Sequence, residues 1–126
     1  MNQPNALDHF GEFLMVSMRD AAIDAFDGIA MEENKAPALQ SLQSDLRTLS
    51  DSQIDLVRRA FITAIDSGLH DFLFSLHEQA SVNARIQISV DGQDVVQLSD
   101  GIQGEMFTDD GWIARFSKFG EPSEDD

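Results

Sequence analysis

The spacing of apolar residues changes once along this chain, and that change constrains the fold more than any other feature. Up to about Ala80 they recur every three or four residues, as in amphipathic helices. After Ala80 they alternate with polar residues, as in half-buried strands. Because the strands follow the helices, the pattern predicts an α+β fold and argues against a parallel sheet built from βαβ units. We expect about four N-terminal helices followed by a small antiparallel sheet, made of a hairpin plus one further strand.

The first two predicted helices are bounded by capping and proline signals. The first begins near Asn5 or Asp8, since either residue can cap a helix, and it ends at Gly28 or continues to Glu33. The second begins at Pro37, whose missing N–H costs nothing in the first turn of a helix. Its leucines are three, four and three residues apart and form a narrow seam that suits a neighbouring helix. This leucine seam consists of Leu39, Leu42, Leu46 and Leu49.

The strongest cap signal introduces the third helix, where Ser50 and Gln53 match a capping box. The apolar stripe after it keeps one phase as far as Ala80, through Ile54, Val57, Phe61, Ile65, Leu69, Phe72 and Leu76. One unbroken helix over this range would be about 45 Å long. A domain of this size has a radius of gyration near 14 Å, so such a rod would protrude. We therefore expect a break at Ser67–Gly68 and a fourth helix over residues 69–79.

The strand-like region contains a hairpin signal, Asp91–Gly92, between two alternating runs. A two-residue loop at this point would scatter apolar side chains over both faces of the strand pair. A three-residue loop over residues 92–94 instead places Val90 opposite Val96 and leaves one apolar face. The sequence therefore favours the three-residue loop. A third strand is predicted over residues 112–119.

The charge of the chain excludes several functions. Acidic residues number 23 and basic residues 8, which gives a net charge of −15, with −10 of it in residues 64–126. Nucleic acids and anionic membrane surfaces both require clustered positive charge, so we expect neither as a partner. The chain has no cysteine, no apolar run near the roughly 20 residues that cross a bilayer, and no signal-peptide pattern. The expected location is the cytoplasm.

No motif in the sequence points to catalysis or to a cofactor. His70 and His77 lie seven residues apart, but the usual spacings of metal-binding histidines are missing. The carboxylates near the predicted sheet lack the spacing of a calcium-binding loop. Nucleophile, phosphate-loop and dinucleotide motifs are also missing. Arg58 and Arg59 are expected to pair with carboxylates such as Asp55 instead of with phosphate.

The segment from Ser99 to Gly111 is the most suggestive part of the chain. Loops are mostly polar, yet this one holds apolar residues among acids. An aromatic and aliphatic centre with an acidic rim is typical of a patch that binds a basic protein. The predicted partner-binding residues are Asp100, Ile102, Glu105, Met106, Phe107, Asp109, Asp110 and Trp112. The alternative is that the apolar residues among them fold back and close the edge of the core.

These observations predict one α+β domain over residues 1–120 and a frayed acidic tail over residues 121–126. The predicted function is that of a small, acidic, soluble protein that acts by stoichiometric protein–protein interaction. An inhibitor or immunity-type module that shields a basic nuclease or toxin would fit. The alternative is a regulatory domain without catalytic activity, a homodimer joined through its sheet edge or its leucine seam. A small-ligand binder or a hydrolase is the least favoured class.

Overall fold

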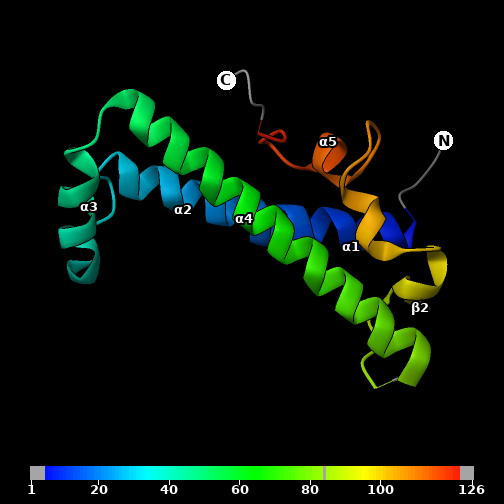
Figure 1. Cartoon of the computed structure of the whole chain (residues 1–126). Helices are drawn as coiled ribbons and strands as arrows, with labels where there is room; N and C mark the ends of the chain where they lie inside the picture. Colours follow the sequence, from blue (N-terminus) through cyan, green and yellow to red (C-terminus); the bar gives the residue numbers. More distant parts are fainter. Residues whose placement is uncertain (1–4, 84, 123–126) are drawn as a thin grey trace.

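A computed structural model of the protein describes residues 5–83 and 85–122. Its main feature is a pair of helical rods that cross each other (Figure 1). The first rod is continuous but contains a π-helical segment in its middle, and the second rod ends in a π-helical turn. The first rod comprises α1 (Ala6–Leu14), η1 (Met15–Asp20) and α2 (Ala21–Ala30), and the second comprises α4 (Asp51–Glu78) and η3 (Gln79–Asn83).

The remaining elements gather at the two ends of this helix pair (Figure 1). At one end, the short 3₁₀ turn η2 (Pro37–Leu39) leads into α3 (Gln40–Arg47). At the other end lie β1 (Ser89–Val90), β2 (Gln93–Asp94), the 3₁₀ turns η4 (Val95–Leu98) and η5 (Ile102–Met106), and the short helix α5 (Trp112–Phe116). Helices are therefore followed by a small antiparallel sheet, and the predicted α+β fold class is confirmed.

Local signals set the beginnings of the helices, as the sequence predicts. Asn5 caps α1, because its side chain accepts a hydrogen bond of 2.8 Å from the backbone N–H of Asp8. Ser50 and Gln53 form the complete capping box of α4: each backbone N–H donates to the side chain of the other, at 2.8 and 3.2 Å. Pro37 opens the turn that leads into α3.

The predicted break at Ser67–Gly68 is wrong, because α4 runs through both residues to Glu78. One glycine inside a helix costs only about 1 kcal/mol relative to alanine, which packing along the rod easily offsets. The 28 residues of α4 span about 42 Å, and the C-terminal half of the rod does not protrude because η5 and η4 cover it. The stripe that becomes buried is Ile62, Asp66, Leu69, Leu73, Leu76 and Ala80.

The hairpin loop consists of two residues, Asp91 and Gly92, so the predicted three-residue loop is wrong. Both loop residues have positive φ angles, 52° and 79°, which the tight turn between twisted strands requires. The prediction assumed a long ladder with one apolar face, but pairing stops after two residues on each strand. At Val95 the chain turns into η4, and this turn buries both Val95 and Val96 in the core.

The predicted third strand over residues 112–119 is also wrong, because residues Trp112–Phe116 form the helix α5. Trp112 and Ile113 are both buried, which a helix allows and a one-sided strand does not. A segment of five residues is too short for the spacing of its apolar side chains to separate a helix from a strand. The sheet therefore has two strands in the part of the chain that the structure describes.

The apolar core lies between α1, the C-terminal half of α4 and the elements that follow the hairpin. Trp112 is at 0% exposure, and its ring meets that of Phe10 edge to face, with ring centroids 5.9 Å apart. The indole also lies directly on Gly11 of α1, where an added Cβ would come within 2.4 Å of it. This core fixes the C-terminal third of the chain onto the helix pair.

Candidate functional site

The predicted partner-binding residues separate into a buried and an accessible group. Ile102, Met106 and Trp112 are fully buried at 0% exposure in this structure. These three residues belong to the apolar core, as the alternative interpretation of the loop expects. The residues of the predicted patch that reach the surface at least in part are Asp100, Glu105, Phe107, Asp109 and Asp110.

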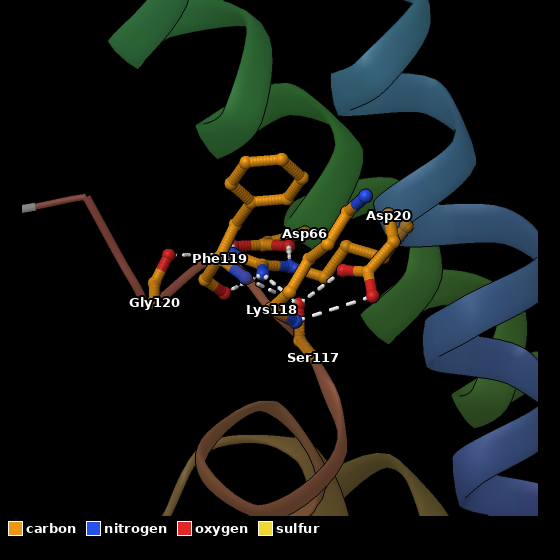
Figure 2. Close-up of polar contacts among 7 residues, drawn as sticks. Asp20, Asp66, Ser117, Lys118, Phe119 and Gly120 are labelled. Carbon is orange, nitrogen blue, oxygen red and sulfur yellow. Dashed lines mark hydrogen bonds and ion pairs between the residues drawn. The ribbon is translucent and has the colours of Figure 1, made fainter.

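The surface around Phe107 is shaped by the segment after α5, residues 117–122, which a buried arginine holds. The side chain of Arg19 is at 0% exposure. Its Nε donates to Asp66 Oδ1 at 2.7 Å and its Nη2 to Asp66 Oδ2 at 3.1 Å. The same guanidinium donates to the backbone carbonyls of Phe119 and Gly120, and Figure 2 labels these two acceptor residues. A buried charge is tolerated only when it is paired and hydrogen-bonded, and Arg19 meets this condition by fixing the C-terminal segment onto α4.

Asp20 holds the same segment from the next position along the first rod. Ser117 Oγ donates to Asp20 Oδ1, and the backbone N–H of Lys118 donates to Asp20 Oδ2 at 3.2 Å (Figure 2). Arg19 and Asp20 are consecutive, yet both are buried. They lie in the π-helical segment η1, whose wider turn is a recurrent feature of functional sites. Here it directs two neighbouring side chains at the C-terminal segment.

Two hollows adjoin the C-terminal segment. The first has a volume of about 490 Å³ and, unlike the second, is lined by cationic side chains. Its lining includes Arg58, Arg59, Lys118 and Phe119. Arg58 donates to the carboxylate of Asp27 at 2.8 and 3.0 Å, and this bond raises the pKa of the arginine. Arg58 therefore pairs with a carboxylate, as predicted, but this carboxylate is Asp27, and Asp55 acts on Arg58 only through its charge. The bond from Lys118 to Asp24 at 2.7 Å raises the lysine pKa in the same way.

The second hollow, of about 640 Å³, is lined by Asp66, His70, Asp71, Phe107, Glu121 and Pro122, with Thr63 and Ser67. No Lys or Arg belongs to this described lining. Asp66 is already bound by Arg19, whereas the side chain of Asp71 is 84% exposed and Glu121 is exposed. The ring of Phe107 lies near that of His70, with centroids 6.1 Å apart. We call this hollow the acidic hollow.

A third, smaller hollow of about 320 Å³ gathers two of the predicted acids, Glu105 and Asp110. Asp8 of α1 joins them there, a residue that the sequence did not indicate as part of the site. Arg115 donates to Asp8 at 2.8 Å, and this bond, supported by the charges of Asp110 and Glu105, raises the arginine pKa. The carboxylates of this hollow are thus already partly compensated by Arg115.

Within residues 5–83 and 85–122, no three His, Asp or Glu side chains are grouped so that they could hold a metal ion. His70 and His77 are both half-buried on α4. None of the helices described here has the length and the apolar character needed to span a bilayer. Comparison with protein-family models, with curated proteins and with solved structures found no match to this chain.

Proposed function

We propose that this protein binds a basic protein partner in a stoichiometric complex, as an inhibitor or an immunity-type module does. The observation that carries the proposal is the acidic hollow. Its exposed carboxylates and its aromatic ring surround a space of about 640 Å³, within the range of ordinary ligand sites. In this proposal the protein works in the cytoplasm and binds neither nucleic acid nor membrane.

The chemistry of the acidic hollow suits an arginine or lysine side chain of the partner. Asp71 and Glu121 offer carboxylates, and hydrogen bonds between a guanidinium and a carboxylate are among the strongest in proteins. Phe107 is 39% exposed at this hollow, so a cation can also lie over its ring. No Lys or Arg belongs to the described lining of this hollow, so the partner competes only with His70, whose Nδ1 lies 3.3 Å from Asp71 Oδ1, and with the cations of the first hollow, which Glu121 also lines.

The net charge supports the same interaction at long range. A charge of −15 steers a basic protein towards this surface and repels acidic ones. Asp100, Asp109 and Asp110 are exposed on the loop that also carries Phe107. The buried residues of the predicted patch contribute by supporting this loop from below. The partner-binding surface is therefore Phe107 and its acidic surroundings instead of the whole predicted patch.

The test uses a synthetic peptide of about ten residues that alternates arginine and glycine, titrated by calorimetry at low and moderate salt. The double variant Asp71→Asn/Glu121→Gln removes two carboxylates of the acidic hollow. The matched control Glu33→Gln/Asp45→Asn removes two exposed carboxylates at the far end of the helix pair. We expect the first variant to bind roughly tenfold more weakly, since a charged hydrogen bond contributes about 1.5–3 kcal/mol, and the control to change affinity less than about threefold.

An equal loss in both double variants would refute the proposal, because net charge alone would then explain the binding. Phe107→Ala gives a second readout. We expect it to weaken binding about threefold, since an exposed cation–π contact contributes about 0.5–1 kcal/mol. Far-UV circular dichroism of each variant confirms that the fold is retained. Weaker binding at higher salt is not sufficient by itself, because any polyanion would show it.

A further inference from the structure

Two ion pairs mark one side of the helix pair. Arg19 of the first rod binds Asp66 of α4, and Asp27 of the first rod binds Arg58 of α4. The C-terminal segment covers both pairs: its carbonyls accept hydrogen bonds from Arg19, and the ring of Phe119 lies 5.4 Å from the guanidinium of Arg58. This side of the helix pair is therefore occupied by the chain itself.

The opposite side is formed by the sequence neighbours of these residues. Met18 and Phe26 each precede an ion-paired residue, and consecutive helical side chains point about 100° apart. Phe26 stacks on Phe61 of α4, with ring centroids 5.0 Å apart. The two rods thus meet in an ion pair on one side and in an aromatic pair on the other. On the first rod, Met18, which directly precedes Arg19, is 44% exposed.

Helical spacing extends this side along α4. Residues four and eleven positions after Phe61 lie on the same stripe, and these are Ile65 and Phe72. Phe72 is 51% exposed and Val57, near the start of the stripe, is 37% exposed. We call Met18, Phe26, Val57, Phe61, Ile65 and Phe72 the helical face. None of these residues is charged, whereas 25% of all residues in the chain are charged.

Gly68, on the same stripe, adds a second observation. It lies inside a 28-residue helix, where glycine is among the least favourable residues. A Cβ at this position would meet nothing within 4 Å, so no contact within the protomer requires a glycine there. A glycine on a helix surface does permit the close approach of another backbone.

We propose that the helical face binds a second copy of this chain, giving a two-fold symmetric dimer. The stripe from Ile54 to Phe72 is about 27 Å long and a helix pair is about 20 Å wide. Two such faces would bury roughly 1,100 Å², just above the 1,000 Å² or so that a specific interface needs. A basic partner gains little from a face without carboxylates, whereas a second copy supplies a matching uncharged surface.

The two dimer surfaces predicted from the sequence are less suited to an interface than the helical face. The strands of the hairpin are two residues long, so the sheet edge provides few hydrogen-bonding groups. Of the four seam leucines, Leu42 is exposed at 46%, while Leu39, Leu46 and Leu49 are already half-buried within the protomer. The test distinguishes a dimer formed through either of these surfaces from one formed through the helical face.

The test is sedimentation velocity over a concentration series from about 2 to about 200 μM, a range that covers micromolar dimers. We expect the mass to rise from 14.0 kDa towards twice that value. Phe72→Asp places a charge on the helical face and should raise the dimer dissociation constant about 100-fold, tenfold for each of the two copies. The control Phe74→Asp alters a side chain of similar exposure, 46%, that points about 200° away on the same helix. It should change the constant less than threefold.

Salt separates this proposal from the proposed function, on which it does not rest. Two protomers that each carry a net charge of −15 repel each other, so added salt, which screens this repulsion, should lower the dimer dissociation constant. The complex with the peptide should instead become weaker as salt is added. A mass of 14.0 kDa at every concentration would overturn the proposal. A dimer unaffected by Phe72→Asp, or equally weakened by Phe74→Asp, would also overturn it and move the interface to the sheet edge or the leucine seam.

Discussion

Gly11→Ala tests most directly how Trp112 is packed against α1. An added Cβ would lie 2.4 Å from both Cε2 and Nε1 of the indole, whereas non-bonded carbon atoms prefer about 3.5–4.0 Å. The indole is at 0% exposure and is fixed on another side by the ring of Phe10, at 5.9 Å between centroids. The indole therefore cannot move the ångström or more needed to relieve this contact without displacing its own neighbours.

The size of the effect follows from two opposing contributions. Alanine in place of glycine normally stabilises a helix interior by about 0.5–1 kcal/mol. Overpacking a core costs about 1–3 kcal/mol, and an overlap of this size belongs at the upper end. We expect a net loss of about 2 kcal/mol in the free energy of unfolding. With an unfolding entropy of about 2.1 cal/mol/K per residue, a chain of 126 residues should lose about 8 °C in Tm.

The assay is urea unfolding, followed both by circular dichroism and by the fluorescence of Trp112, the only tryptophan. Gly28→Ala is the matched control, since Gly28 lies within α2 and a Cβ there would meet nothing within 4 Å. The control should stabilise the protein by about 0.5–1 kcal/mol. If Gly11→Ala stabilises it as well, the indole does not lie on the α1 backbone and the reasoning is refuted.

Two further predictions concern the segment after α5. Arg19→Met should destabilise the protein by about 3–5 kcal/mol in urea unfolding, because Asp66 is left buried without its partner. Adding Asp66→Leu should restore part of this loss. A cost below about 1 kcal/mol for Arg19→Met alone would contradict the proposed role of Arg19. The raised pKa of Lys118, caused by its hydrogen bond to Asp24, adds stability that is fully present below the unfolded pKa of about 10.4 and is lost as pH rises through the folded pKa. The urea midpoint should therefore fall more steeply above about pH 10 in the wild type than in Lys118→Met, and equal slopes would show that the bond is absent in solution.

The features that the sequence predicts correctly are those with local causes. The cap at Asn5, the capping box at Ser50 and the proline at Pro37 each act through hydrogen bonds or dihedral angles within a few residues. The order of helices and strands likewise follows from apolar spacing over long stretches, where a period is well defined. Local signals therefore suffice for the fold class and for where the helices begin.

The errors arise where tertiary contacts decide the outcome. Gly68 is a potential break, but the packing of α4 on the rest of the chain keeps the helix whole. Val96 and Leu98 alternate with Gln97, yet the strand ends at Asp94 because the core accepts both Val95 and Val96. The run from Trp112 is short enough to form either a strand or a helix, and its contacts with α1 and η5 settle the choice.

The site was only partly accessible to sequence reasoning for a related reason. Acidity and an unusual apolar content identify the loop that carries Phe107, but they cannot say which apolar side chains turn inward. The network of Arg19 was missed because its partners lie 47 to 101 residues away along the chain. One signal was present: Arg19 is the only Lys or Arg before Lys35. Because arginine is almost never fully buried unless it is paired, a lone cation on an apolar helix is a candidate for a buried ion pair.

The two proposed surfaces can act together because they lie on opposite sides of the helix pair. The C-terminal segment and the acidic hollow occupy the side of the Arg19–Asp66 ion pair, while the helical face occupies the side of the stack between Phe26 and Phe61. A dimer formed through the helical face therefore leaves an acidic hollow open on each protomer. Phe72→Asp should then separate the protomers without changing the affinity of either for the arginine peptide. A coupled loss of both activities would mean that the surfaces are not independent, and that the helix pair itself rearranges when the dimer dissociates.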